Sequence, residues 1–222
     1  MLNCLAMDIT YLGHSSFKLR GKTASVITDP FDPKFVGLKY PSGEADIVTI
    51  SHNHPDHNKS ELIKNVKMVV EGPGEYEISG VSMIGIPSFH DAKRGEERGS
   101  NTIYVFEIDG LRIAHLGDLG GVLSDEQIAQ LGSIDVLMLP VGGIYTVGPK
   151  EAVKVVGEID PYFVIPMHYK VNGLSSELSK LEPVETFLAE SGLTVEKMDK
   201  FSLKREDILI DQSTKIVLLP RK

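Results

Sequence analysis

The sequence predicts a layered α/β protein, built as one domain over residues 1–222. Its first half alternates short β-type runs with turns that contain glycine or proline, and its second half alternates apolar strands with amphipathic helices. No linker, repeat or low-complexity stretch separates the two halves. The hydrophobic content of 41% is ordinary for a protein with a sizeable core. Residues 1–6 are expected to be a disordered or strand-extending tail.

The first half is expected to consist mainly of strands, at residues 8–12, 16–20, 24–28, 46–50, 68–71, 75–78, 81–87, 102–108 and 111–115. Prolines and glycines predict a loop over residues 29–43. Asp109-Gly110 is a strong signal for a two-residue hairpin turn. Residues 58–64 are expected to form a short helix, which would place the Asp56 carboxylate near a helix start, where the helix dipole favours negative charge.

Helices enter the pattern in the second half. Residues 124–131 are expected to be a helix, with Ser124 and Gln127 forming a capping box. A second helix is expected over residues 149–159, with Pro149 near its first position, and a third over residues 182–191, ended by Gly192. Strands are expected at residues 135–140, 162–166, 194–198 and 215–219.

The stretch Ser51-His52-Asn53-His54-Pro55-Asp56-His57 carries the strongest chemical signal of the chain. It places three imidazoles and one carboxylate within six residues, directly after an apolar strand. Neutral imidazole nitrogens and carboxylate oxygens are ligands of borderline divalent metals such as Zn²⁺. The pattern would arise by chance in roughly one chain in a few thousand, so a metal site is strongly favoured over a polar loop.

Three further candidate ligands lie in loops just past predicted strands. They are His90, Asp118 and His168. Rigid sheets present functional groups in such loops, although a single histidine or aspartate there is more often a turn residue. Three such positions, together with the primary motif, favour a shared metal centre.

These motifs, in this order, resemble the metallo-β-lactamase superfamily. The resemblance implies a four-layer αβ/βα sandwich, in which two mixed β-sheets lie between outer helices. It also implies that His52, His54 and His90 bind one metal, that Asp56, His57 and His168 bind a second, and that Asp118 bridges both. The stretches 9–17 and 142–149 are similar to a subgroup that includes ascorbate-6-phosphate lactonase, many Zn-dependent hydrolases and, more distantly, N-acyl-phosphatidylethanolamine phospholipase D.

The resemblance implies two divalent metal ions, with zinc expected and manganese or iron as alternatives. A hydroxide held between the metals would be the nucleophile, so Asp56 and Asp118 count as catalytic through it. Summed formal charges leave roughly +1 on the metals and their ligands, which favours an anionic substrate. The expected activity is hydrolysis of a small ester, lactone or phosphorylated compound.

Several other residues are candidates for supporting ligands or contacting substrate. His14 lies in a Gly-His-Ser turn, where a role in the metal site and a purely structural role are equally favoured. For His115 a supporting or structural role is favoured over direct ligation. Tyr145 and Thr146 lie in a glycine-rich loop suited to substrate contact or to a simple turn. Lys93, Arg94 and Arg98 could hold an anion, but a loop neutralised by its own Glu96 and Glu97 is favoured.

Three alternatives to a small-molecule hydrolase stay open. They are a phosphodiesterase or nuclease, an enzyme that uses iron for redox chemistry, and a metal-binding scaffold without turnover. A net charge of −8 argues against a general polyanion binder, so no nucleic acid partner is expected. No apolar run approaches the ~20 residues of a membrane span, so no membrane partner is expected. A single cysteine fits a reducing compartment, and cytoplasmic residence is expected. The sequence leaves open whether the protein forms a homo-oligomer.

Overall fold

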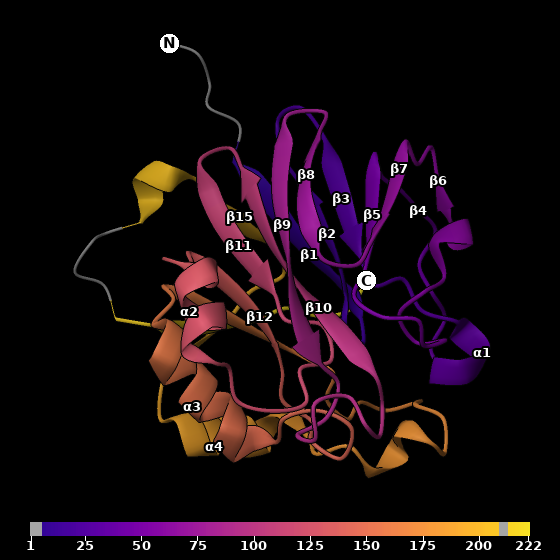
Figure 1. Cartoon of the computed structure of the whole chain (residues 1–222), viewed down its shortest axis with the longest axis vertical. Helices are drawn as coiled ribbons and strands as arrows, with labels where there is room; N and C mark the ends of the chain where they lie inside the picture. Colours follow the sequence, from indigo (N-terminus) through magenta and orange to yellow (C-terminus); the bar gives the residue numbers. More distant parts are fainter. Residues whose placement is uncertain (1–5, 209–212) are drawn as a thin grey trace.

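The computed structural model describes residues 6–208 and 213–222, and its centre is a pair of facing β-sheets (Figure 1). The smaller sheet has the strand order β15-β1-β2-β3-β5-β7. Its strands are β1 (Met7–Gly13), β2 (Ser16–Arg20), β3 (Ser25–Thr28), β5 (Ile47–Ile50), β7 (Met68–Glu71) and β15 (Phe201–Leu203). Neighbours from β15 to β3 pair antiparallel, whereas β3, β5 and β7 pair parallel, so the sheet is mixed.

The larger sheet has eight strands in the order β14-β16-β13-β12-β11-β10-β9-β8 and is also mixed. Its strands are β8 (Gly74–Ile78), β9 (Val81–Phe89), β10 (Ser100–Ile108), β11 (Leu111–His115), β12 (Val136–Pro140), β13 (Phe163–Met167), β14 (Thr194–Lys197) and β16 (Lys215–Leu218). A small parallel pair, β4 (Gly43–Glu44) and β6 (Ile63–Lys64), lies apart from both sheets.

The main core fills the space between the two sheets. Phe17 and Leu19 from β2 pack in the same cluster as Tyr104 and Phe106 from β10. The outer face of the larger sheet buries a second cluster against α2 (Asp125–Leu131), α3 (Pro149–Ile159) and α4 (Val184–Ser191), which lie together at the lower left of Figure 1. This arrangement is the expected α/β sandwich.

The outer layer of the smaller sheet differs from the expectation of covering helices. It consists of the single-turn helix α1 (Pro33–Val36), the β4–β6 pair, loops and two 3-10 turns at Ser60–Leu62 and Leu178–Lys180. Apolar side chains from these loops, such as Phe31 and Leu38, bury the outer face in place of long helices. A third 3-10 turn spans Arg205–Asp207. None of the helices in the described residues is long and apolar enough to cross a lipid bilayer.

Local signals for helix ends and turns are confirmed. The side chain of Ser124 accepts from the Gln127 amide, and the Gln127 side chain accepts from the Ser124 amide, which forms the predicted capping box. Pro149 begins α3. Asp109 and Gly110 both have positive φ, 53° and 80°, and they join β10 to β11 as a tight hairpin.

Two expectations were wrong, one helix begins later than expected, one strand of the smaller sheet was not predicted, and the expected tail lies largely outside the described residues. Residues 58–64 form a 3-10 turn followed by β6, because Ile63 adopts an extended backbone and buries its side chain. The helix expected over 182–191 is confirmed, with its end at Ser191 before Gly192, but it begins at Val184, since Pro183 takes the extended position before it. Within the expected loop 29–43 lies α1, capped by Asp32, and β15 was not predicted. Of the expected tail, only Ala6 is described, half-buried ahead of β1.

Candidate metal centre

All seven predicted ligands converge between the two sheets, at one end of the sandwich. Ring nitrogens of His52, His54 and His90 lie within 4.8 Å of one another. Ligand atoms of a second group, which contains Asp56, His57 and His168, lie equally close together and include His14. A third group links the two, since it contains His52, His57 and Asp118.

Asp118 lies between the two histidine groups. Its Oδ2 atom is 3.2 Å from His90 Nε2 and 3.3 Å from both His57 Nε2 and His168 Nε2. The distance from Asp118 Oδ2 to His52 Nε2 is 3.9 Å. This is the position that the family resemblance implies for a carboxylate shared by two metals.

The ligands reach one place because each follows the carboxyl end of a strand. The primary motif follows β5, His90 follows β9, Asp118 follows β11 by three residues, and His168 follows β13. Gly117, with φ +54°, lets the loop after β11 approach β10 closely: a Cβ there would lie 2.3 Å from Asn101 Oδ1 and 2.6 Å from Ser51 Cβ. The Asp118 amide then donates to Asn101 Oδ1 at 2.9 Å, which fixes the start of the Asp118 side chain.

Asp29, which the sequence reasoning missed, is the buried residue that holds the primary motif in place. Its Oδ2 lies 2.8 Å from His57 Nδ1 and 2.6 Å from the Ser51 hydroxyl, and its Oδ1 accepts from the Ser51 amide at 2.8 Å. A carboxylate bonded to one ring nitrogen of a histidine leaves the other nitrogen free to bind metal. The signal was available, because Asp29 directly follows the apolar strand β3, as the predicted ligands follow theirs.

Backbone strain is concentrated at this end of the sandwich. Asp29, His14 and His168 have φ values of 40°, 54° and 52°, in the left-handed region that side-chain-bearing residues seldom adopt. The His168 amide donates to the His14 carbonyl at 2.9 Å, which connects two of the strained residues. Strained residues persist where surrounding structure holds them, and they cluster at functional sites.

The charges in the cluster oppose one another at close range. Burial alone would raise the pKa of Asp118. The neighbouring His168 and His57 have a larger opposite effect, so the pKa of Asp118 lies well below its usual value. Burial also opposes the charge on His57, yet Asp118 and Asp56 bring its pKa well above its usual value. Burial and the charge of His57 lower the pKa of His52 to about 3. The Asp118 carboxylate is therefore ionised and His52 is neutral near pH 7, the states in which these two groups bind metal, whereas His57 must give up a proton to do so.

The pKa of Asp56 is also held well below its usual value, but not by a helix start. Burial would raise it, and His57 and His14 outweigh that effect. The Nε2 atom of His14 lies 3.1 Å from Asp56 Oδ2 and forms a hydrogen bond with it. Because residues 60–62 form only a 3-10 turn, the expected stabilisation of Asp56 by a helix dipole is replaced by these two histidines.

The donor set fits divalent cations. Within the described part of the chain, several buried atoms of the cluster have no hydrogen-bond partner. They include Nε2 of His52, His57 and His168 and Oδ1 of Asp118, and also Nδ1 of His14, His90 and His168. Buried polar atoms are rarely left without partners, because each costs roughly 1–3 kcal/mol. Unpartnered imidazole nitrogens and carboxylate oxygens that face one another have the chemistry of zinc, manganese or iron ligands.

The four candidate supporting residues are placed differently. His14 lies in the second ligand group, with its ring centroid 4.2 Å from that of His168. His115 is fully buried and outside the three ligand groups; its Nε2 lies 2.8 Å from the Ser15 carbonyl and its Nδ1 accepts from the Gly117 amide. Tyr145 lines the pocket above the cluster. Thr146 does not line it and bonds the Val147 carbonyl.

The pocket has a volume of about 290 Å³ and opens directly onto the cluster. Its base includes His54, Asp56, His90, Asp118 and His168, and its walls include Phe35, Arg98, Tyr145, Glu177 and Leu178. Lys93 forms an ion pair with Glu97 at 2.6 Å, as expected of a self-neutralising loop. Arg98 differs from that expectation, because it lines the pocket.

Comparison with known proteins identifies related chains with the same architecture. The family described as the Beta-lactamase superfamily domain matches residues 8–168. A UPF0173 metal-dependent hydrolase of Thermococcus onnurineus is 33% identical over 191 residues, which cover 73% of this chain and 84% of the relative. One from Archaeoglobus fulgidus is 30% identical over 230 residues, covering 82% of this chain and 98% of the relative.

Solved structures show the same fold. A crystal structure from Thermotoga maritima, described as a candidate Zn-dependent hydrolase of the metallo-β-lactamase superfamily, superposes with a TM-score of 0.78 and is 37% identical, covering 96% of this chain and 100% of the other. Igni18, a metallo hydrolase from Ignicoccus hospitalis, has a TM-score of 0.59 at 21% identity, covering 84% of this chain and 91% of the other.

Proposed function

The chain belongs to the metallo-β-lactamase superfamily, and we propose that it is a metal-dependent hydrolase of small ester, lactone or phosphorylated substrates. The observation that carries this proposal is the convergence of five histidines and two aspartates below an open pocket. The names of the relatives as metal-dependent hydrolases support the reaction class. Membership in the subgroup that includes ascorbate-6-phosphate lactonase is part of this proposal.

The residues suggest how two divalent cations would be held. His52, His54 and His90 would bind one, Asp56, His57 and His168 would bind the other, and Asp118 would contact both. Mixed nitrogen and oxygen donors suit zinc, with manganese and iron as alternatives. When bound, two such cations act as Lewis acids and lower the pKa of water to near 7.

The chain's own groups would orient and protect this chemistry. Asp29 fixes the ring of His57 through Nδ1, and Asn101 fixes the backbone at Asp118. Serine, threonine and cysteine are absent from the described residues that line the pocket, and the Tyr145 hydroxyl donates to the Glu177 carbonyl, so no aliphatic hydroxyl or thiol is placed to attack substrate. The walls of Phe35 and Leu178 exclude water from one side of a bound substrate.

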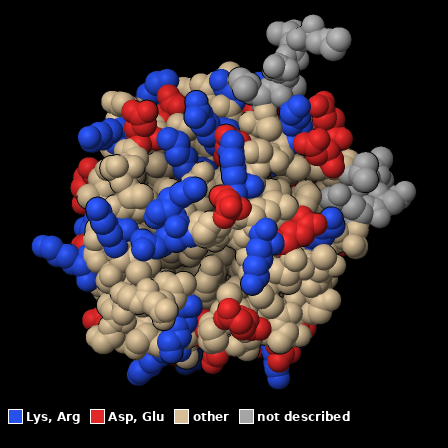
Figure 2. All heavy atoms as spheres, turned by 180° about the vertical axis from the view of Figure 1, so that it is seen from behind, with Lys and Arg blue, Asp and Glu red and all other residues tan. Residues whose placement is uncertain are grey.

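A phosphodiesterase is the second candidate, and one observation favours it. Although the net charge is −8, lysine and arginine side chains predominate in the upper left part of the face opposite the view of Figure 1, with aspartate and glutamate side chains among them (Figure 2). A cationic surface attracts phosphate-bearing molecules before they reach a site. The small pocket volume favours small phosphodiesters over nucleic acid as substrates.

The test is a metal-dependent activity screen. Protein stripped with a chelator and reloaded with zinc, manganese or iron is assayed on p-nitrophenyl butyrate, a γ-lactone and bis-p-nitrophenyl phosphate. We expect activity only in reloaded protein. For Asp118→Ala we expect kcat/KM to fall more than about a hundredfold, which exceeds the loss usual when a metal ligand loses a hydrogen-bond partner. Asp199→Ala, at an exposed turn, is the matched control. Activity that survives either metal removal or Asp118→Ala contradicts the proposal.

A further inference from the structure

We propose that Arg98 selects substrates that carry a carboxylate or phosphoryl group, an inference that rests on the proposed hydrolase function. Arg98 lines the same pocket as the candidate ligands His54, His90 and Asp118. It is the one arginine or lysine among the described residues that line this pocket. Although Glu97 and Glu177 also line the pocket, Arg98 is therefore the side chain of the lining whose charge attracts an anionic group of a substrate held over the cluster.

The charge of Arg98 is free to bind a ligand. In the parts of the chain that the structure describes, 6–208 and 213–222, no carboxylate forms an ion pair with the Arg98 guanidinium. Its neighbour Glu97 is already paired with Lys93. The Arg98 guanidinium carbon lies 5.6 Å from the centre of the Tyr145 ring, a cation–π distance that leaves its N–H groups available. Guanidinium groups bind carboxylate and phosphate through paired hydrogen bonds.

The backbone of Arg98 is held in place by Asp91, a buried residue that directly follows His90. Asp91 Oδ2 accepts from the Arg98 amide at 2.8 Å and from the Glu97 amide at 3.1 Å. Its Oδ1 accepts from the amides of Lys93 and Gly95, at 2.8 and 2.9 Å. One carboxylate thus ties the whole 91–98 loop to the residue beside a candidate ligand, which sets the position of Arg98 relative to the cluster.

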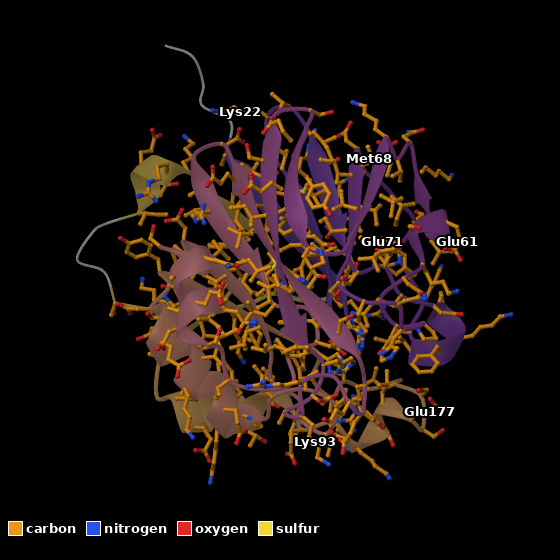
Figure 3. All side chains as sticks on the ribbon, viewed as in Figure 1. Lys22, Glu61, Met68, Glu71, Lys93 and Glu177 are labelled. Atoms are coloured by element: carbon orange, nitrogen blue, oxygen red, sulfur yellow. The ribbon has the colours of Figure 1, made fainter. Side chains whose placement is uncertain are left out.

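The facing wall limits the size of the ligand. The Tyr145 hydroxyl donates to the Glu177 carbonyl at 2.9 Å, so the segment around residue 145 is joined to the segment around residue 177. Lys93 and Glu177, labelled in Figure 3 at the lower edge of the molecule, mark the two loops that flank the pocket. Phe35 and Leu178 add apolar surface. A small organic ester with a short apolar body and one terminal anionic group matches this lining.

The experiment compares esters that differ in one charge. Metal-loaded protein is assayed on p-nitrophenyl butyrate and on mono-p-nitrophenyl glutarate, which adds a terminal carboxylate. Phosphoryl recognition is assayed by inhibition of butyrate hydrolysis with glycerol 3-phosphate against glycerol. The variants are Arg98→Met, which keeps an unbranched apolar side chain but removes the charge, and Arg94→Met as the matched control. Arg94 lies in the same loop but lines a different cavity.

For Arg98→Met we expect the ratio of kcat/KM for the glutarate ester to that for the butyrate ester to fall about 10- to 100-fold, mainly through KM. A hydrogen bond to a charged group supports a change of this size. We expect Arg94→Met to leave the ratio unchanged. If Arg98→Met also loses inhibition by glycerol 3-phosphate, Arg98 binds phosphoryl groups as well as carboxylates. If it loses only the preference for the glutarate ester, Arg98 selects carboxylates alone.

An unchanged ratio and unchanged inhibition in Arg98→Met, with metal-dependent turnover intact, would overturn the inference and leave the proposed function standing. If no ester is hydrolysed by the metal-loaded protein, the proposed function fails, and the inference is decided by calorimetry with glutarate and glycerol 3-phosphate as the probes. Binding at least tenfold weaker in Arg98→Met than in Arg94→Met then supports it. Equal binding in the two variants contradicts it.

Discussion

The floor and the rim of the pocket are built on different principles. We use floor for the buried cluster at the base, which comprises His14, Asp29, His52, His54, Asp56, His57, His90, Asp118 and His168, and rim for the loop residues above it, which comprise Phe35, Glu97, Arg98, Tyr145, Glu177 and Leu178. Most floor residues are buried, and their ring nitrogens and carboxylate oxygens lie within 4.8 Å of one another in each group. Most rim residues are exposed or half-buried and are joined by few contacts.

The difference assigns separate tasks to the two regions. A floor in which Asp29 orients His57 and His14 orients Asp56 suits metal binding, because an ion requires fixed donors. A rim of loops can change its side chains without disturbing those donors, which suits substrate selection. Substitutions in the floor are therefore expected to change metal affinity first, and substitutions in the rim to change substrate preference alone.

The largest effect is expected from the floor substitution Asp29→Asn. An amide has nearly the shape of the carboxylate, but its NH₂ group would face His57 Nδ1 and the Ser51 hydroxyl, so His57 would lose its oriented hydrogen bond. Losses of this kind reduce metal affinity by roughly 10- to 100-fold. Metal competition with a chromophoric chelator measures the affinity. The control is Asp32→Asn, which retains a helix-capping side chain four residues after the end of β3. Equal metal affinities in the two variants would show that Asp29 does not orient a metal ligand.

A smaller loss, about tenfold in affinity for the more weakly bound metal, is expected for His14→Ala. His14 hydrogen-bonds Asp56 through Nε2, and alanine removes that bond. His14→Gln distinguishes the role of this side chain, because a glutamine amide can donate to Asp56 but is a poor metal ligand. Recovery of most of the affinity in His14→Gln identifies a positioning residue. The same loss in both variants would instead make His14 a ligand itself, and no loss in either would exclude both roles.

The smallest effect is expected at the rim, for Tyr145→Phe. This substitution removes the hydrogen bond to the Glu177 carbonyl and keeps the aromatic ring beneath Arg98. One neutral hydrogen bond contributes about 0.5–1.5 kcal/mol, so KM for a small ester should rise a few-fold at most. Metal content, measured by elemental analysis, should equal that of the unsubstituted protein. A loss of bound metal would show that floor and rim are not separable.

The floor was largely predictable from sequence, because most of its candidate ligands come from a contiguous motif and from positions just past apolar strands. Local signals of this kind, such as the Ser124 capping box and the hairpin at Asp109-Gly110, also survive intact in the fold. Asp29 was missed because its hydrogen-bond partners Ser51 and His57 are 22 and 28 residues away, although its place after β3 matches the pattern of the candidate ligands.

The rim could not be predicted in the same way, because its contacts join loops that are distant in sequence. Lys93 and Arg98 lie in one charged stretch, yet only the structure separates the residue paired within the loop from the one that faces the pocket. The helix expected over 58–64 failed for a related reason. Ile63 is buried beside the smaller sheet, and this tertiary burial favours a short extended segment over the local helical pattern.

The proposed function requires the floor to hold two divalent cations through Asp118 and the two histidine groups. Elemental analysis of protein reloaded with zinc and freed of excess metal by gel filtration tests this requirement directly, with Asp118→Ala analysed beside it. We expect close to two zinc ions per chain for the unsubstituted protein, and one or fewer for Asp118→Ala. A content of one ion or none in the unsubstituted protein, or two ions retained in Asp118→Ala, would contradict it.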